Sequence, residues 1–402
     1  MASLDRREFL RRSAAAGFAL SLPALSGAGA DEPPRVRRRA VLGRTGLSIS
    51  DIGFGSSRLA GDEALVRHAL ERGIDYFDTA ESYADGASEE TLGRALRGVR
   101  DKVTIASKVS CETSYRVADL FRALDGSLRR LQTDRIDIYF NHAVNDVARL
   151  RNPEWTEFTA RAKKQGKIRF TGMSGHGGRL CECLDYAFDH DLVDVVLVGH
   201  NYGQDPAFYQ RFTASLDFIA MQRDLPRLLA KAKQKNVGVI AMKTLRGARL
   251  NDLRAYEREG GTFAQAAFRW VLSRPHVDGL IVSMTSQEQV DEYLVASGAA
   301  RVTRGDLLLL ARYEQRNGAT QCRYGCGACL SSCPEDVPID AVLRTRMYAE
   351  DYGAPELARA EYAALGSGAE ACIGCSHRAC TGACPHGIDI SSLTAHAHRI
   401  LA

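Results

Sequence analysis

The chain lacks an excess of either sign of charge. Its 402 residues include 53 Lys and Arg and 49 Asp and Glu, which gives a net charge of +4, and both signs are mixed along the sequence. Proteins that bind nucleic acid usually gather basic residues into patches or stripes. The charge pattern therefore argues against nucleic acid as a partner.

Long apolar runs are also missing. The N-terminal run 14–25 is too short for a stable membrane span, which needs about 20 apolar residues. Arg6-Arg7 and Phe9-Leu10 precede it, and Ala28-Gly29-Ala30 follows it just before Asp31. This arrangement resembles a bacterial twin-arginine export signal. It implies the twin-arginine translocase as a partner and a periplasmic location for the mature protein. A disordered basic tail is the alternative.

Cysteine is scarce in most of the chain and concentrated near its end. Eight of the 11 cysteines lie between Cys322 and Cys384. Clustering of this kind indicates local metal or disulfide chemistry. We therefore divide the chain into a signal peptide over residues 1–30, a large domain over 31–310 and a cysteine-rich domain over 311–402.

Apolar runs alternate with amphipathic segments in the large domain, and no internal repeat is visible. The spacing of apolar residues predicts helices over 116–131 and 262–273, among others. The candidate strands lie near 51–55, 74–78, 103–108, 136–141, 168–173, 193–198, 237–241 and 279–282. Eight strand-helix pairs over this length predict an α/β fold, the (β/α)8 or TIM barrel. A six-stranded open sheet is the structural alternative.

One connection in this domain is unusually long. It runs from the strand ending near Val198 to a helix starting near Asp224 and is rich in aromatic residues. Loops of this length are usually functional or mobile. We interpret it as a substrate lid, with a plain surface excursion as the alternative.

Four polar residues stand at the ends of three successive predicted strands. Asp78 ends the second strand and Tyr83 follows it, Lys108 ends the third, and His142 follows the fourth. Strand ends of one barrel meet at one rim, where such folds place their chemistry. An ammonium beside a phenol lowers the phenol pKa from about 10 by favouring the phenolate. Asp78 would hold Lys108, and His142 would donate to a substrate carbonyl oxygen. Taken singly, each residue has an ordinary structural explanation.

The large domain resembles the aldo-keto reductase family over about residues 38–300. The resemblance rests on Leu42–Leu47 with Gly53-Phe54-Gly55, on Asp78-Thr79-Ala80 through Tyr83, and on Gly166–Arg169 with Gly172-Met173-Ser174. It implies reduction of aldehydes or ketones with NADP(H), or the reverse reaction, with a small carbonyl or alcohol substrate. The implied catalytic residues are Tyr83 as general acid/base with Asp78, Lys108 and His142.

The same resemblance implies a set of cofactor-binding residues. They are Ser174, Asn201, Ser283, Thr285, Ser286 and Gln289. The chain departs from the family pattern at Leu197, where a Gln usually contacts the nicotinamide, and at Met242, where a Tyr usually stacks on it. The phosphate-adenine stretch also lacks the usual Pro-Gly before it and has Tyr293 where an Asn is common.

The cysteine-rich domain contains two runs of four cysteines, and each run ends in Cys-Pro. The eight residues are Cys322, Cys326, Cys329, Cys333, Cys372, Cys375, Cys380 and Cys384. The runs resemble those of ferredoxins and imply two [4Fe-4S] clusters in a small, mainly α-helical ferredoxin-like iron-sulfur domain. In such ferredoxins the fourth Cys of each run binds the other cluster, so Cys333 and Cys384 would cross over. Zinc sites and disulfides are the alternatives.

Two functional hypotheses follow from the whole chain. The first is an exported oxidoreductase of aldo-keto reductase type, whose clusters relay electrons to a redox protein partner or are structural. The second is an iron-sulfur electron-transfer protein in which the barrel is a docking scaffold.

Overall fold

The computed structural model describes residues 33–177, 179–204, 224–245, 257, 261–317, 322, 326–350, 355–366 and 368–402. The segment 34–402 forms one compact unit by itself. The predicted signal peptide and most of the predicted lid lie outside the described residues. No helix among the described residues is long and apolar enough to cross a membrane.

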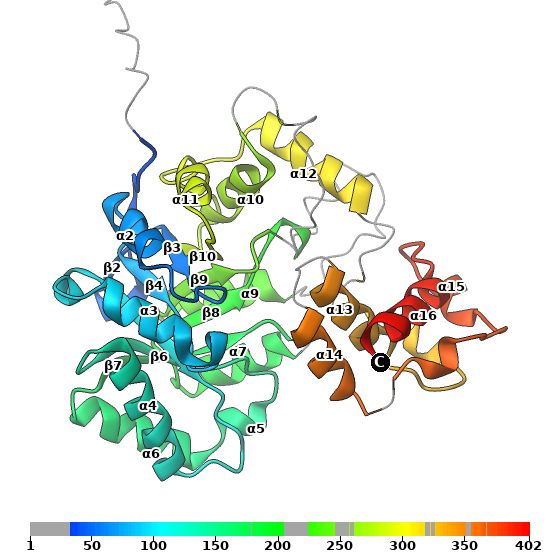
Figure 1. Cartoon of the computed structure of the whole chain (residues 1–402), viewed down its shortest axis with the longest axis horizontal. Helices are drawn as coiled ribbons and strands as arrows, with labels where there is room; N and C mark the ends of the chain where they lie inside the picture. Colours follow the sequence, from blue (N-terminus) through cyan, green and yellow to red (C-terminus); the bar gives the residue numbers. More distant parts are fainter. Residues whose placement is uncertain are drawn as a thin grey trace, which may run out of the picture. The chain divides into compact units, whose positions relative to one another are not determined.

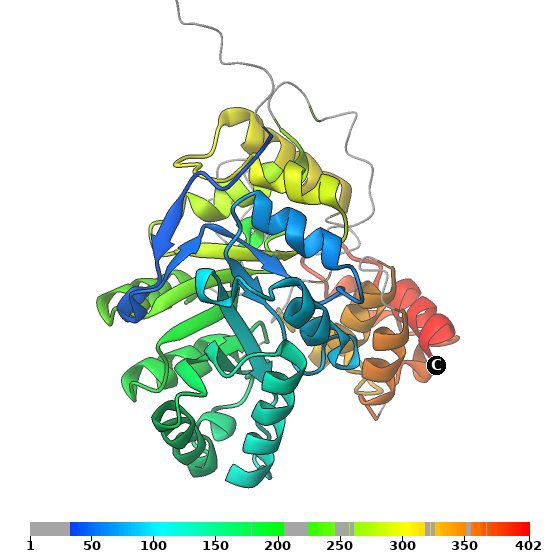
Figure 2. The same cartoon turned by 60° about the vertical axis from the view of Figure 1, so that its left-hand side comes forward.

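Eight parallel strands close into a barrel, as the sequence predicts, and Figures 1 and 2 show helices around it. The strands are β3 (Ile52–Gly55), β4 (Tyr76–Asp78), β5 (Thr104–Val109), β6 (Ile136–Asn141), β7 (Ile168–Gly175), β8 (Val195–Gly199), β9 (Gly238–Met242) and β10 (Gly279–Ser283). They pair in chain order, and β10 closes the ring by pairing with β3. The open-sheet alternative is thus wrong.

Helices follow the strands because their apolar residues recur at helical spacing and pack on the outside of the barrel. These helices are α2 (Glu63–Glu71), α3 (Ala87–Ala95), α4 (Val117–Leu131), α5 (Val147–Leu150), α6 (Pro153–Lys164), α7 (Leu180–Asp189), α9 (Leu225–Gln234), α10 (Phe263–Leu272), α11 (Gln287–Leu294) and α12 (Arg304–Asn317). Helix α12 passes over the expected domain boundary at residue 310, and Tyr313 still packs in the core of the barrel.

Alternate residues of the strands fill the inside of the barrel. Tyr76, Ile138 and Leu197 belong to this inner cluster, whereas Phe77 and Tyr139, their neighbours in sequence, pack outward against the helices. Such alternation is the side-chain period of a β-strand. The interior is therefore packed with side chains.

A hairpin of β1 (Arg39–Val41) and β2 (Ser48–Ser50) closes the end of the barrel at which the strands begin. Leu42, Leu47 and Ile49 of this hairpin join the inner cluster. Gly43 has φ +49°, and a Cβ there would lie 2.4 Å from the Gly238 nitrogen at the start of β9. Only glycine allows the hairpin to approach the barrel this closely.

The C-terminal part has a separate apolar cluster formed by short helices. They are η6 (Leu330–Ser332), α13 (Ile339–Glu350), α14 (Pro355–Ala363), η7 (Glu370–Cys372), α15 (Ala379–Gly382) and α16 (Ile390–Leu401). Helix α13 packs against α14 and α16, and Figure 1 shows all of them in orange and red. The described residues of this part form no strand, consistent with the mainly helical domain predicted.

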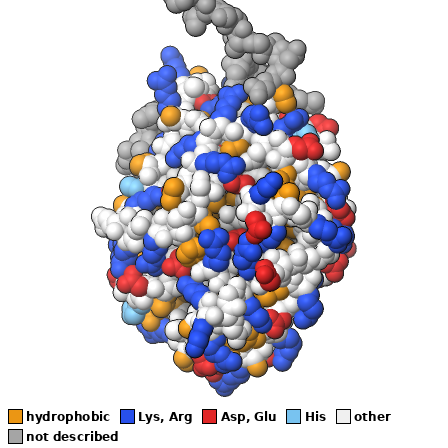
Figure 3. All heavy atoms as spheres, turned by 90° about the vertical axis from the view of Figure 1, so that its left-hand side faces the viewer, with side chains coloured by type: hydrophobic (Ala, Val, Ile, Leu, Met, Phe, Trp, Pro, Cys, Tyr) orange, Lys and Arg blue, Asp and Glu red, His pale blue; other side chains and the backbone are white. Residues whose placement is uncertain are grey.

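The surface carries both signs of charge. Figure 3 shows Lys and Arg side chains intermingled with Asp and Glu side chains over the face it presents. This mixture agrees with the charge pattern of the sequence.

Candidate active site

A buried ion pair lies at the carboxyl ends of β4 and β5. The Lys108 Nζ donates to Asp78 Oδ1 at 2.5 Å and to the Thr79 carbonyl oxygen at 2.6 Å. Both charged side chains are 1% exposed. Burial acts to lower the pKa of Lys108, but Asp78 and the Tyr83 phenol outweigh it and raise that pKa above its ordinary value. The lysine is therefore held charged.

Tyr83 stands between this pair and His142. It opens the short 3-10 helix η2 (Tyr83–Gly86), in which Ala84, Asp85 and Gly86 all have left-handed φ values of +49°, +51° and +91°. The Lys108 Nζ lies 4.9 Å from the centre of the Tyr83 ring, and the Tyr83 and His142 rings meet edge to face at 5.8 Å. The structure thus brings all four predicted catalytic residues together at one rim.

The pKa of Tyr83 differs from the sequence-based expectation. Burial raises it above its ordinary value of 10, and the Lys108 ammonium lowers it only in part. Desolvation penalises the phenolate more than one shared ammonium favours it. The phenol is therefore held protonated, which suits it to give a proton.

His142 is held neutral. Burial, assisted by the positive charges of Lys108, Arg149 and Lys243, lowers its pKa to about 3. A neutral imidazole carries one N–H and can donate one hydrogen bond. Such a group can polarise a carbonyl oxygen without protonating it.

Arg149 fixes the backbone that carries His142, a role that the sequence did not indicate. Its guanidinium donates to the carbonyl oxygens of Cys111 at 2.9 Å, His142 at 2.8 Å and Ala143 at 3.1 Å, and to Asn141 Oδ1 at 2.9 Å. The planar fork of arginine can satisfy several acceptors at once, which lysine cannot. Ala143 is also held in a left-handed conformation, with φ +51°.

We expect Arg149→Met to lower kcat for aldehyde reduction by about 10- to 100-fold, since small displacements of a positioned group cost that much. The pKa of His142 should also rise, because one of the charges that lower it is lost, so activity should fall on the acid side of the pH profile. Arg149→Lys keeps the positive charge but loses the planar guanidinium, so its pH profile should stay close to that of the wild type while its kcat stays low. An unchanged kcat and pH profile in Arg149→Met would exclude this positioning role.

The predicted cofactor residues lie on the same rim, from β7 round to α11. Ser174 is buried at the end of β7, and its Oγ accepts from the Ala143 N–H at 2.9 Å. Asn201 follows β8 and donates through Nδ2 to the Lys243 carbonyl oxygen at 3.2 Å. Ser174 keeps a hydroxyl proton to donate, so its bond to the His142 loop does not exclude a cofactor contact.

The remaining cofactor positions gather where β10 leads into α11. The Ser283 hydroxyl lies 2.6 Å from that of Ser57, and Thr285 donates through both N–H and Oγ1 to Gln289 Oε1. Ser286 caps α11 by accepting from the Gln289 N–H at 3.3 Å. Hydroxyl groups beside a helix N-terminus fit an anion such as a phosphate.

Two of the departures from the family pattern lie on the strands of the barrel. Leu197 points into the packed interior of the barrel and offers no hydrogen bond, while Met242 is only partly buried at the end of β9. Their contribution to a nicotinamide site would be apolar.

Three further basic residues, His176, His200 and Lys243, directly follow β7, β8 and β9. The rule that identified Lys108 and His142, a polar residue at a strand end, would have found them.

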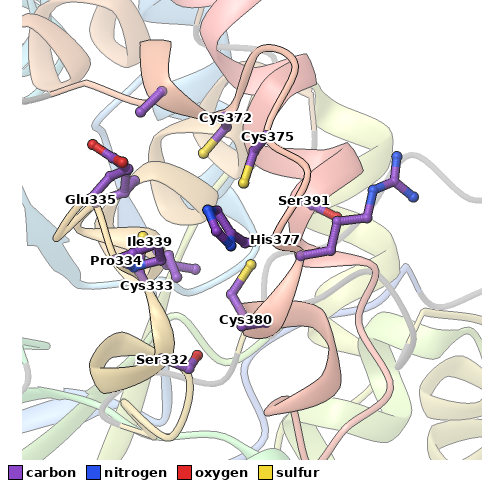
Figure 4. A pocket seen from close by; sticks show the side chains of 14 residues that line it. Ser332, Cys333, Pro334, Glu335, Ile339, Cys372, Cys375, His377, Cys380 and Ser391 are labelled. Carbon is purple, nitrogen blue, oxygen red and sulfur yellow. The ribbon is translucent and has the colours of Figure 1, made fainter.

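A pocket in the C-terminal part is lined by cysteines from both runs. The pocket is lined by Cys333 from the first run and by Cys372, Cys375 and Cys380 from the second. Figure 4 shows these side chains around it, with the His377 ring among them. Burial raises the pKa of the Cys329 thiol to about 11, assisted by Cys384, Cys326 and Cys380.

Among the described residues, no group of three or more His, Cys, Asp or Glu side chains could hold a metal ion. Zinc sites and four-iron clusters both take four thiolate ligands, and the cysteines that line the pocket are donors of that type. Burial raises the pKa of Cys322 to about 12, which disfavours a thiolate without a cation beside it.

All 11 cysteines are free thiols in the structure. None of the disulfides considered from the sequence is formed.

Comparison with known proteins agrees with the barrel fold. Residues 51–260, more than half of the chain, match the Aldo/keto reductase family. L-galactose dehydrogenase of Arabidopsis thaliana is 27% identical over 296 residues, which cover 64% of this chain and 86% of that protein. Methylglyoxal reductase YeaE of Escherichia coli (strain K12) is 29% identical over 233 residues, which cover 56% of this chain and 75% of that protein.

A solved structure is also similar. The aldo-keto reductase from Klebsiella pneumoniae in complex with NADPH is 26% identical, covers 70% of this chain and 95% of its own, and superposes with a TM-score of 0.52. The family match, the closed barrel and the convergence of Asp78, Tyr83, Lys108 and His142 agree, and the chain belongs to the aldo/keto reductase family of oxidoreductases.

Proposed function

We propose that the protein reduces a carbonyl compound with NADPH, or oxidises the corresponding alcohol with NADP+, using Tyr83 as the general acid/base. The observation that carries the proposal is the position of Tyr83 between the buried Lys108–Asp78 pair and the neutral His142. When bound, NADP(H) supplies or takes up the hydride. The rest of the chemistry belongs to residues of the chain.

In the direction of reduction, His142 donates its N–H to the carbonyl oxygen and orients it. Tyr83 gives its proton to the same oxygen as negative charge develops there. Lys108 stabilises the phenolate that remains, and Asp78 keeps Lys108 charged and in place. The raised pKa of Tyr83 favours this direction, because the phenol is protonated at neutral pH.

The cofactor would lie along the rim from β7 to α11. Ser174 and Asn201 are placed for the nicotinamide end, and Ser283, Thr285, Ser286 and Gln289 for the phosphate and adenine end. The NADPH complex of the Klebsiella pneumoniae protein supports this choice of cofactor.

We also propose two [4Fe-4S] clusters in the C-terminal part. Cys333, Cys372, Cys375 and Cys380 would hold one, and Cys322, Cys326, Cys329 and Cys384 the other. Such clusters supply or accept single electrons, which implies a redox protein partner if they are not purely structural. The twin-arginine pattern near Arg6-Arg7 supports export to the periplasm through the translocase after cofactors have been inserted.

The first experiment identifies what the mature protein carries. We expect released NADP(H) by chromatography, broad visible absorbance of the iron-sulfur type, and loss of NADPH absorbance when an aldehyde is added. Iron-sulfur absorbance without nicotinamide binding or aldehyde reduction would instead support the electron-transfer hypothesis.

A further inference from the structure

A second buried carboxylate lies behind the catalytic residues. Glu89 of α3 is 0% exposed, and its Oε1 accepts a hydrogen bond from the Ser107 hydroxyl at 2.5 Å. Its Oε2 accepts from the Nε of Arg130, on α4, at 2.7 Å. Burying a carboxylate costs free energy unless it is paired and hydrogen-bonded, and Glu89 has both kinds of partner. Ser107 directly precedes Lys108 on β5, so the Glu89–Arg130 ion pair is attached to the strand that carries the catalytic lysine.

The Arg130 side chain also contacts the turn that follows Tyr83. A Cβ added at Gly86, the last residue of η2, would lie 2.8 Å from the Arg130 Cδ and 3.0 Å from its Nε. A Cβ added at Gly126, one turn earlier in α4, would lie 3.2 Å from the Arg130 Nη1. The arginine is thus flanked by two glycines, and it fills the space between Glu89 and the backbone of the turn.

The turn itself has a strained backbone. Ala84, Asp85 and Gly86 have consecutive left-handed φ values of +49°, +51° and +91°, a conformation that only glycine adopts readily. Other residues persist there only where their surroundings fix them. Because Tyr83 opens this turn, a shift of the turn would move the phenol relative to the other catalytic residues.

Ser88, the residue before Glu89, fixes the same end of α3 to two further strand ends. Its hydroxyl lies 2.8 Å from that of Thr79, whose carbonyl oxygen accepts from the Lys108 Nζ at 2.6 Å. It also lies 2.6 Å from the hydroxyl of Ser56, which directly follows β3. The start of α3 is therefore fixed to β3, β4 and β5, and the arginine of the ion pair extends this fixed structure to the turn.

We propose that the Glu89–Arg130 ion pair is a positioning device for Tyr83, which holds η2 where the phenol meets Lys108 and His142. The pair joins α3 to α4, which carry none of the proposed cofactor residues, so it would act through Tyr83 alone. The inference rests on the proposed function, in which Tyr83 gives the proton. Displacing a positioned group by about 1 Å can cost about 100-fold in rate, so loosening the turn should lower kcat.

The test removes the pair without leaving a buried charge behind. Glu89→Gln with Arg130→Met keeps an acceptor for the Ser107 hydroxyl and avoids the unpaired carboxylate that Arg130→Met alone would leave. With NADPH and 4-nitrobenzaldehyde, the full-length double variant should lose about 10- to 100-fold in kcat, while KM for NADPH changes by less than about twofold. Arg129→Met, which removes the exposed neighbour on α4, is the matched control and should change neither.

Two further readouts distinguish positioning from a contribution to stability alone. In a Tyr83→Phe background, the same double substitution should cost no further rate, because the group that the pair positions is already lost. Hydrogen exchange should become faster at the amides of residues 81–87 in the double variant, while the amides of β5 keep the wild-type rate. Should the double variant not fold, Arg130→Lys gives the same comparisons, since it keeps the charge but not the guanidinium beside Gly86.

The inference is overturned if the double substitution lowers kcat as much in the Tyr83→Phe background as in the wild type. It is also overturned if neither kcat nor exchange at residues 81–87 changes. If the wild-type protein reduces no aldehyde but exchange in the turn still becomes faster in the double variant, the proposed function fails and the ion pair remains the support of the turn.

Discussion

Tyr83→Phe is expected to lower kcat for aldehyde reduction by about 100- to 10,000-fold, the range that general acid catalysis supplies. Phenylalanine keeps the ring that packs edge to face on His142 but has no proton to give. NADPH affinity should change little, because the proposed cofactor residues lie from β7 to α11. Single-turnover kinetics, which isolate the chemical step, should show the full loss.

The pH dependence offers a second readout of the same residue. Because the pKa of Tyr83 is raised above 10, reduction by the wild-type protein should persist to high pH and decline only as the phenol loses its proton. Oxidation of the alcohol needs the phenolate, so its rate should rise with pH. Tyr186→Phe removes a hydroxyl on the outer helix α7 and serves as the control. Retention of wild-type turnover by Tyr83→Phe would contradict the assignment of the proton donor.

Cys333→Ala is expected to remove one of the two clusters and to reduce iron from about eight to about four per chain. Crossed ligation predicts that adding Cys372→Ala costs no further iron, because both residues line the same pocket. It predicts that adding Cys329→Ala to Cys333→Ala removes the remaining four. Iron and sulfide analysis, together with electron paramagnetic resonance, would measure the cluster content of both double variants.

These double variants separate the possible ligand sets. If each run held its own cluster, the results would reverse: Cys333→Ala with Cys329→Ala would keep four irons, and Cys333→Ala with Cys372→Ala would keep none. Cys181→Ala, in α7 of the barrel, is the control and should leave iron unchanged. Zinc in place of iron would refute the cluster proposal.

The barrel could be predicted from the sequence because its strands are short apolar runs bounded by polar segments. The strand expected over 136–141 is β6 to the residue, and that near 279–282 is one residue short of β10. Parallel strands buried on both faces leave this signature even in one sequence. The catalytic residues could be predicted for a related reason, since the end of the strand at which a residue lies decides which rim of the barrel it reaches.

Other features could not be read from the chain because they depend on contacts distant in sequence. Arg149 donates to the carbonyl oxygen of Cys111, 38 positions away, and no local sequence pattern indicates that contact. The pKa of Tyr83 was expected to be lowered, but the extent of its burial is decided by packing. The domain boundary expected at residue 310 lies within α12, because apolar spacing does not show which cluster a helix joins.

The hairpin that closes the barrel has a consequence for proton supply. Below Lys108 and Asp78, the interior holds the buried Tyr76 and otherwise apolar members of the inner cluster, and Leu42, Leu47 and Ile49 seal it. The Tyr76 hydroxyl has no hydrogen-bond partner, so the inner cluster of the described residues offers the buried pair no continuous polar relay toward the floor of the barrel. The proton that Tyr83 gives up must be replaced through the opening by which substrate enters. Tyr83 is therefore reprotonated only after product has left or water has entered beside it.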